Sequence, residues 1–380
     1  MNSSHRVYLD NAATSWPKPE TVYEAVEHYQ RNLGAPAGRS AYREAADVER
    51  QIRDARKRVA QLINARRAEQ VVFTNNGTDS LNQAIHGVLR PGDHVVTTVV
   101  EHNSVLRPLR QLEMDHGVEV TRVPCDGLSL VDPQEIRKAL RTNTRLIAMI
   151  HASNVTGSLQ AVDEVAQLAK HHGALFLVDA AQSLGHVPID VQAWGVDLLA
   201  APGHKGLLGP LGTGVLYIAP GLEKQVRPIR QGGTGTDSGN DRQPDSMPDR
   251  FETGNHNVPG ILGLRAGVAF IAERGLDQIR EHEMTLTAQL IEGLAAIEGI
   301  RVLGPIDMSQ RVGVVSITAR GYDPHEVATM LDAVQSIQVR SGLHCAPRVH
   351  ESLGTILLGG AIRFSLGPFN SSSDIESATG

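Results

Sequence analysis

The sequence predicts an α/β protein with a mostly parallel sheet in a large lobe and a smaller α+β lobe. From about residue 70, short apolar runs alternate with longer stretches of helical period. Several runs are apolar on successive residues, which is typical of strands that helices cover on both faces. The chain has 380 residues, of which 41% are hydrophobic, enough for one large core and one smaller core.

Seven apolar runs are the expected strands of the large lobe, at 71–73, 94–100, 118–123, 146–150, 175–178, 196–200 and 214–218. Stretches of helical period between them, such as 163–172, are the expected crossover helices of a three-layer lobe.

The second lobe is expected to begin near residue 260, after a loop at 232–259 that is rich in Gly, Asp, Asn and Pro. Long ordered loops of this kind are usually functional. Helical stretches at 261–279 and 284–297 and strand-like runs at 312–318, 337–340 and 361–366 follow it. We predict a large domain at 15–259, and a small domain formed by 1–14 and 260–380.

Composition excludes several classes of protein. The net charge is −6 and the basic residues are scattered, which argues against nucleic-acid binding. No apolar run approaches the roughly 20 residues that span a bilayer, and the N-terminus has no apolar signal core, so we expect a cytoplasmic protein without a membrane partner. With only two cysteines, Cys125 and Cys345, each is expected to be a free thiol. We predict no metal site.

A turn that suits a phosphate follows the first predicted strand. It reads Asn-Asn-Gly-Thr-Asp-Ser at 75–80, directly before the helical run 81–89. Backbone N–H groups at a helix start attract anions, Gly77 allows close approach and Thr78 adds a hydroxyl. An ordinary helix cap is the alternative interpretation of the same residues.

An acid and a lysine follow two other predicted strands. Asp179 stands at the edge where open α/β sheets bind ligands, and it suits a pyridinium nitrogen, a metal or a ribose hydroxyl, or caps a helix. Lys205 lies between glycines, where burial would lower its pKa and free its lone pair for an imine. A solvated loop lysine is the alternative. The glycine-rich run 209–214 precedes a strand, so it is not a dinucleotide loop.

Cys345 lies in a loop bounded by Gly342 and Pro347, with His344 adjacent and Arg340 and Arg348 nearby. Positive neighbours favour the nucleophilic thiolate, although adjacency in sequence does not make His344 its base. Cys125 ends a predicted strand without such neighbours, and we interpret it as structural.

Two further residues complete the pattern. His102 ends the run 94–100, where an imidazole stacks on a flat ring, shuttles protons or simply packs. Arg363 lies in the run 361–366, and its planar fork fits a carboxylate or pairs with a structural acid. A phosphate turn, a ring-nitrogen acid, an imine lysine and a carboxylate arginine are the minimum set for pyridoxal 5'-phosphate (PLP) acting on an amino acid.

The chain resembles the class V aminotransferase-type PLP enzymes from about residue 7 to residue 370. The shared motifs, in order, are Asp-Asn-Ala-Ala-Thr at 10–14, Asn-Gly-Thr at 76–78, Glu-His at 101–102, Ser-Asn-Val-Thr-Gly at 153–157, Asp-Ala-Ala-Gln at 179–182 and His-Lys at 204–205. The segment Arg-Ser-Gly-Leu-His-Cys-Ala-Pro at 340–347 is similar to that of the cysteine desulfurases, in the short-loop SUF-type group of iron–sulfur cluster assembly. The resemblance implies PLP fold type I (aspartate aminotransferase-like), with a mostly parallel seven-stranded sheet. It also implies a homodimer with the active site at the subunit interface.

The resemblance also implies roles for single residues. Lys205 would hold PLP covalently as a Schiff base and move the α-proton, Asp179 would face the pyridine nitrogen, and His102 would stack on the ring. Cys345 would take the sulfur of L-cysteine as a persulfide, leaving L-alanine, and a sulfur-acceptor protein would receive that sulfur. The other roles are phosphate binding by Gly77, Thr78, Asp79 and His204, contact with the ring substituents by Asn154 and Gln182 (Gln182 near the phenolic oxygen), and substrate-carboxylate binding by Arg363, with Arg340 and Asn11 as lesser candidates.

Three departures from the family pattern stand out. Pro202 replaces a frequent hydroxyl residue, so one phosphate contact should be missing. Asn255 replaces a frequent Thr that reaches the phosphate of the neighbouring subunit, and it still offers a donor. We also expect 371–380 to lack the family's terminal helix.

Other activities stay open on the sequence alone. They are a different PLP-dependent C–S or C–Se lyase (cystine or selenocysteine lyase), a class V aminotransferase, and a scaffold without activity. Selenocysteine is an alternative substrate to L-cysteine. Cys345 is the residue that discriminates between these activities.

Overall fold

The computed structural model describes residues 6–38 and 41–380, and its largest sheet has seven strands in the order β2-β8-β7-β6-β5-β3-β4. The strands β3 to β7 run parallel, whereas β8 is antiparallel to both β7 and β2. The prediction of a mostly parallel seven-stranded sheet is therefore confirmed. The bounds are β2 Val71–Thr74, β3 His94–Thr98, β4 Glu119–Val123, β5 Thr144–Ile150, β6 Leu175–Asp179, β7 Leu198–Pro202 and β8 Gly214–Ile218.

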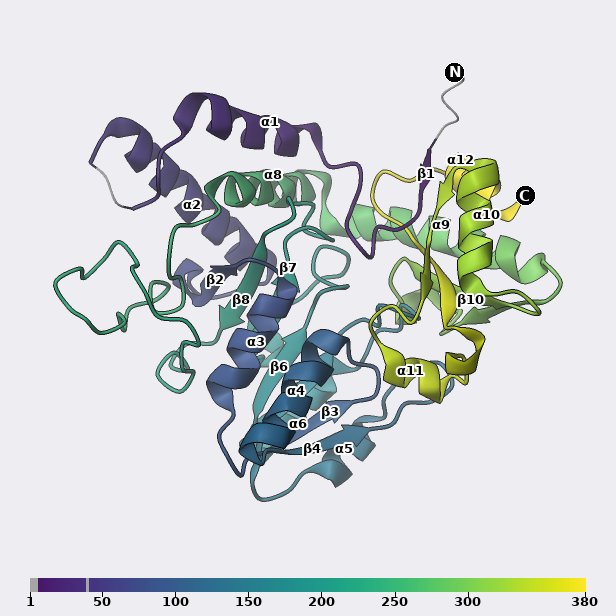
Figure 1. The fold of residues 1–380 in the computed structure, drawn as a ribbon, viewed down its shortest axis with the longest axis horizontal. Coiled ribbons are helices and arrows are strands. Elements are labelled where there is room, and N and C mark those ends of the chain that lie inside the picture. The colour runs from purple at the N-terminus through teal and green to yellow at the C-terminus, as the bar shows by residue number, and fades with distance from the viewer. Residues whose placement is uncertain (1–5, 39–40) are drawn as a thin grey trace.

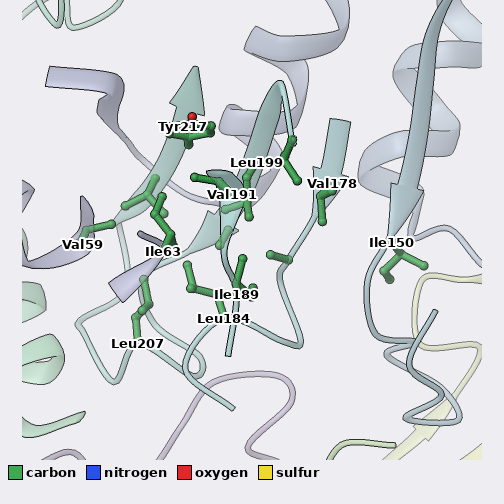
Figure 2. Packing of buried hydrophobic residues seen from close by; sticks show 14 of the residues in the cluster. Val59, Ile63, Ile150, Val178, Leu184, Ile189, Val191, Leu199, Leu207 and Tyr217 are labelled. Atoms are coloured by element: carbon green, nitrogen blue, oxygen red, sulfur yellow. The ribbon is translucent and has the colours of Figure 1, made fainter. Parts of the chain in front are cut away.

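Helices cover both faces of this sheet (Figure 1). Successive strand residues point to opposite faces, so Leu177 and Leu198 join one apolar core while Val178 and Leu199 join the other. Figure 2 shows Val178 and Leu199 in the second of these cores, together with Val59. This packing explains why the strands are apolar on successive residues. The helices are α3 Gly77–Val88 and α4 Asn103–His116 on the first face, and α2 Arg43–Leu62, α5 Pro133–Ala139, α6 Val162–His172, α7 Val191–Trp194 and α8 Val258–Arg274 on the second.

A second, smaller sheet lies in the C-terminal part of the chain. It has four antiparallel strands in the order β12-β13-β10-β9. A short parallel pair, β1 with β11, brings the start of the chain to this lobe, as the purple strand beside the yellow-green elements shows in Figure 1. The bounds are β1 Val7–Tyr8, β9 Ile300–Leu303, β10 Val314–Ala319, β11 Ile337–Gln338, β12 Arg340–Gly342, β13 Ala361–Ser365, α9 Leu276–Ala296, α10 Pro324–Gln335, α11 Pro347–Ser352 and α12 Ser372–Thr379.

The expectation that no terminal helix follows residue 371 is wrong, because α12 forms there. The Ser371 hydroxyl accepts from the Asp374 N–H while the Asp374 carboxylate accepts from the Ser371 N–H, which closes a reciprocal cap. Ile375 is buried in the core of the small lobe. The polar run of serines looks like a loop, but the cap and the packing of Ile375 and Ala378 on the core stabilise two helical turns.

Other boundaries also differ from the prediction. The helix expected at 261–279 ends at Arg274, because Gly275 adopts a φ of +85° and separates α8 from α9. The run expected at 337–340 divides into β11 and β12, and β9 is not predicted at all.

The predicted domain boundaries at residues 15 and 260 stay predictions. Helix α8 packs against α1 (Glu20–His28) and α2 of the large lobe, which favours a later boundary near Gly275. Within the two described ranges, no helix is both long and apolar enough to cross a bilayer.

Candidate active site

One cavity lies at the edge of the large sheet where β2, β5, β6 and β7 end. The strands run in the same direction there, so the loops that follow them meet at this edge. Most of the predicted site residues are brought together. The cavity is lined by Asn76, Gly77, Thr78, Leu81, His102, Ser104, Ile150, Asn154, Asp179, Ala181, Gln182, Pro202, His204 and Lys205.

The turn between β2 and α3 forms one wall. Asn76 caps α3 and its side chain accepts from the Asp79 N–H at 2.9 Å, so this N–H, predicted to bind phosphate, already has a partner. The Asp79 carboxylate pairs with Arg230 at 2.6 Å. The N–H groups of Gly77 and Thr78 stand at the head of the helix, where an anion binds favourably.

Gly77 packs closely on Pro202, the residue that departs from the family pattern, and leaves little room for a side chain. A Cβ atom at Gly77 would lie 3.0 Å from Cδ of Pro202 and 3.2 Å from its nitrogen. The backbone of the phosphate turn therefore lies directly against the end of β7, and Pro202 brings no hydroxyl there.

His102 caps α4 and is hydrogen-bonded to Ser104. Its Nδ1 atom accepts from the Ser104 N–H at 3.0 Å, and the Ser104 hydroxyl in turn lies 2.7 Å from the Thr78 hydroxyl. Burial, with help from the positive charge of Lys205, lowers the pKa of His102 to about 4. The ring is neutral at physiological pH, so it suits stacking rather than ion pairing.

Asp179 and Lys205 supply opposite charges to the cavity. Asp179 is the last residue of β6, is almost fully buried and accepts from the Ala181 N–H at 2.9 Å. Burial raises the pKa of Asp179, so this carboxylate gains from a cationic partner. Burial, followed by the charge of Arg363, lowers the pKa of Lys205 to about 8. An amine with this pKa keeps its positive charge in most molecules near physiological pH but has a far larger neutral, nucleophilic fraction than an ordinary lysine.

The peptide before Lys205 is held by the N-terminal segment. The carbonyl of His204 accepts from the Ser15 N–H at 3.0 Å, from Lys18 Nζ at 2.9 Å and from the Thr14 hydroxyl at 3.2 Å. The His204 ring has a buried Nδ1 atom without a partner among the described residues, and burial lowers its pKa to about 4.

Gln182 and Asn154 are both buried at the cavity. Gln182 Nε2 donates to the carbonyl of Ala12 at 3.0 Å. Asn154 Nδ2 donates to the carbonyl of His344 at 2.6 Å, and its Oδ1 atom has no partner among the described residues. Asn154 therefore joins the cavity to the loop that carries Cys345.

Arg363 is buried on β13 and is already paired. Its Nη2 atom lies 2.8 Å from Asp10 Oδ1, and Nη1 donates to the carbonyl of Asn154 at 3.1 Å. The structure therefore agrees with the second interpretation of Arg363, in which it pairs with an acid of the chain itself. Nε remains without a partner among the described residues.

The two lesser candidates lie in different surroundings. Arg340 Nη2 lies 3.8 Å from the sulfur of Cys345. The Asn11 amide donates to the carbonyl of Ser365 and to the Asn370 side chain, and accepts from the Trp16 N–H. Asn11 therefore anchors the N-terminal segment, and its substrate role stays a prediction.

Cys345 is exposed in the loop between β12 and α11. His344 and Cys345 both have positive φ, +49° and +58°, and the Asn103 N–H donates to the Cys345 carbonyl at 2.7 Å. The His344 ring is buried and stacks on His350, and burial lowers its pKa to about 2. His344 is therefore no cation, and the adjacent positive charge comes from Arg340.

The other cysteine has a different environment. Cys125 follows β4 and packs half-buried against the large core. Burial raises the pKa of the Cys125 thiol, which agrees with a structural residue.

Asn255 is separated from the Lys205 cavity. It is exposed and lines another cleft with Arg56, Glu252 and His256. Its contact with the phosphate of a neighbouring subunit stays a prediction.

Sequence reasoning missed Asp10, Ser104, Glu101 and Lys18. Glu101 is fully buried, accepts from the Ile150 N–H at 3.0 Å, and burial raises its pKa to about 8. Asp10 and Glu101 belong to the motifs at 10–14 and 101–102, but the sequence does not indicate their partners. Ser104 and Lys18 give no signal beyond an ordinary polar residue.

Comparisons with known proteins agree with this geometry. The Aminotransferase class-V family model matches residues 7–377. A probable cysteine desulfurase of Methanothermobacter thermautotrophicus is 38% identical over 97% of this chain and 92% of its own length, and a cysteine desulfurase of Yersinia pseudotuberculosis is 31% identical over 99% and 92%.

Solved structures show the same likeness. The apo structure of a cysteine desulfurase from Thermococcus onnurineus superimposes with a TM-score of 0.92 at 36% identity, covering 98% of this chain and 93% of that one. A cysteine desulfurase from Escherichia coli, solved in an S-sulfonic acid form, gives a TM-score of 0.88 at 30% identity over 98% and 93%. The predicted PLP fold type I architecture is confirmed. The chain belongs to the class V aminotransferase family, among its cysteine desulfurases.

Proposed function

We propose that this protein is a PLP-dependent cysteine desulfurase that converts L-cysteine to L-alanine and passes the sulfur to Cys345 as a persulfide. One observation carries the proposal. An exposed thiol is held by its backbone to α4 and, through Asn154, to a cavity that contains Lys205, Asp179 and His102.

The residues of the cavity fit PLP. Asn154 Oδ1 and His204 Nδ1 are buried polar atoms without partners among the described residues, as expected for atoms that face a polar ligand. Asp179 is a buried acid that gains from a cation, and Lys205 is a buried amine with a lowered pKa. Gly77, which has no Cβ atom, begins α3, and the N-terminus of this helix suits a phosphate.

Each group would hold a different part of PLP. Lys205 would bind it covalently, Asp179 would face its ring nitrogen and His102 would stack on its ring. The phosphate would lie against the N–H groups of Gly77 and Thr78, the Thr78 hydroxyl and His204. When bound, PLP supplies an electron sink for the charge left on the substrate α-carbon.

The chain's own residues do the proton chemistry. The Lys205 amine, with its lowered pKa, would take the α-proton of the substrate and return it later. His102 stays neutral, so it adds no positive charge beside the ring nitrogen that Asp179 would face. Arg363 would hold the substrate carboxylate. Its guanidinium would either bind that carboxylate and Asp10 together or leave Asp10 to do so.

Cys345 performs the sulfur transfer. Its thiolate forms a bond to the substrate sulfur while the carbon–sulfur bond breaks, and the electron pair of that bond stays with the carbon framework. Protonation of that carbon gives alanine, and the persulfide remains on Cys345. The guanidinium of Arg340 lies 3.8 Å from the sulfur and places a positive charge beside the sulfur that reacts.

Several partners follow from this proposal. A persulfide must be handed on, and the exposure of Cys345 supports delivery to a sulfur-acceptor protein. We propose a cytoplasmic homodimer of the SUF-type group. Asn255 is exposed in a separate cleft, so it is accessible to a neighbouring subunit, and iron–sulfur cluster assembly is the expected pathway.

Product analysis with L-cysteine and a reductant tests the function. We expect equal amounts of alanine and sulfide from the wild type and almost none from Cys345→Ala. Wild-type turnover by Cys345→Ala would contradict the proposal. Pyruvate and ammonia as products would instead favour a C–S lyase, and the same assay with selenocysteine would reveal a preference for selenium.

A further inference from the structure

An ion pair behind the cavity joins the two lobes. His186 lies in the loop after β6, and Glu283 lies on α9 of the small lobe. His186 Nδ1 is 2.9 Å from Oε2 and 3.1 Å from Oε1 of Glu283, and the Glu283 side chain is only 1% exposed. Neither residue lines the cavity that contains Lys205.

The ring of His186 packs against the segment that carries Lys205. A Cβ atom at Gly206 would lie 2.7 Å from His186 Cδ2 and 2.3 Å from the carbonyl oxygen of Leu184. A Cβ atom at Gly185 would lie 2.2 Å from the carbonyl oxygen of Gly206. No side chain fits between these two loops, so a shift of His186 must move Gly206 and the adjacent Lys205.

The loop of His186 also reaches a predicted cofactor contact. His186 and Gln182 line the same small cavity, and Gln182 donates to the carbonyl of Ala12. His186 is therefore close to two predicted site residues, Lys205 through Gly206 and Gln182 through the small cavity.

The contact with Glu283 favours the protonated form of His186. Burial by itself lowers the pKa of His186, but the Glu283 carboxylate raises it more, and the net pKa is above the ordinary value. Breaking a buried charged pair on one side leaves the partner without compensation, so the pair resists separation. It therefore holds the β6 loop firmly against α9.

We propose that His186 and Glu283 are positioning residues that fix the Lys205 segment from the small lobe. Neither lines the cavity that would hold PLP, and both would act through Gly206. The inference rests on the proposed function, because it assumes that Lys205 is the residue that reacts with PLP.

The test compares PLP uptake by the full chain after its cofactor has been removed with hydroxylamine. Uptake is followed by the visible absorbance of bound PLP at one mildly alkaline pH, and thermal unfolding is recorded for each variant. Glu283→Leu removes the partner of His186, whereas Glu283→Gln keeps the shape and an acceptor. Glu113→Leu is the matched control, because Glu113 pairs with Arg122 at 2.6 Å between α4 and β4.

We expect Glu283→Leu to slow uptake by about tenfold, because a displaced amine reacts poorly, and Glu283→Gln to stay within about twofold. Glu113→Leu is expected to lower thermal stability without slowing uptake. Wild-type uptake by a cooperatively folded Glu283→Leu protein, or equal slowing by Glu113→Leu, would overturn the inference.

A second variant decides the matter if Glu283→Leu does not fold. Glu283→Asp keeps the charge but withdraws the oxygens from His186, and uptake slowed by about threefold supports the inference, whereas the wild-type rate overturns it. A wild-type chain that takes up no PLP overturns the proposed function itself.

Discussion

The Lys205 cavity and the Cys345 loop are built in opposite ways. Lys205, Asp179 and His102 stand at the ends of strands between two apolar cores, and burial shifts the pKa of each. Cys345 is exposed, and both it and His344 have positive φ. One region is a buried cavity, and the other is a loop open to solvent.

The difference separates two tasks. Proton transfer gains from a dry, rigid cavity, where charges interact strongly. A thiol that must carry sulfur to another protein has to reach the surface. Asn154 and Asn103 connect the two regions through the carbonyls of His344 and Cys345.

Removing the amine of the cavity is expected to have the largest effect. Lys205→Ala should lower alanine formation by roughly 10² to 10⁴-fold, because no other residue would move the α-proton. Steady-state assays with L-cysteine measure this loss, and Lys170→Ala, an exposed lysine on α6, serves as the control with unchanged activity. A Lys205→Ala rate above a tenth of wild type would show that the cavity is misassigned.

Cutting the link between the two regions is expected to have an intermediate effect. Asn154→Ala removes the 2.6 Å hydrogen bond to the His344 carbonyl, so the Cys345 loop should lose its fixed position. We expect sulfur transfer in a single turnover to slow by about tenfold, while PLP binding falls less.

The matched variant is Asn143→Ala, because this asparagine also donates to a backbone carbonyl, that of Gly92, at 3.1 Å. An Asn154→Ala protein that transfers sulfur at the wild-type rate would show that the loop is held without Asn154.

The smallest expected effect is the change of PLP uptake with pH, which tests the burial of Lys205 in the cavity and does not involve the Cys345 loop. Only the neutral amine reacts, and the pKa of Lys205 is lowered to about 8. Uptake by the cofactor-free chain should therefore rise with pH and level off above about 8. A rate that still rises near pH 10, as for an ordinary lysine with a pKa of about 10.4, would contradict a buried Lys205.

The sequence was sufficient to predict the large sheet and most of the cavity. Successive apolar residues in strands such as 175–178 indicate cover on both faces, and strand ends then bring Gly77, Asp179 and Lys205 to one edge. Periodicity is less informative in the small lobe, where it does not predict β9, and α12 is not predicted because its cap, Ser371 with Asp374, lies in a run of polar residues.

The sequence does not predict which partner each side chain has. Arg363 was recognised as a fork for a carboxylate, yet its bond to Asp10 joins residues far apart in the sequence. His186 and Glu283 gave no signal, because their pairing depends on how the lobes pack rather than on any local pattern.

The most direct test of the account is to locate the sulfur after a single turnover. The wild-type protein is mixed with L-cysteine without reductant, its thiols are alkylated, and peptides are analysed by mass spectrometry. We predict one added sulfur atom on the peptide that contains Cys345 and none on the peptide that contains Cys125. Sulfide and alanine released with no sulfur on Cys345 would contradict the account.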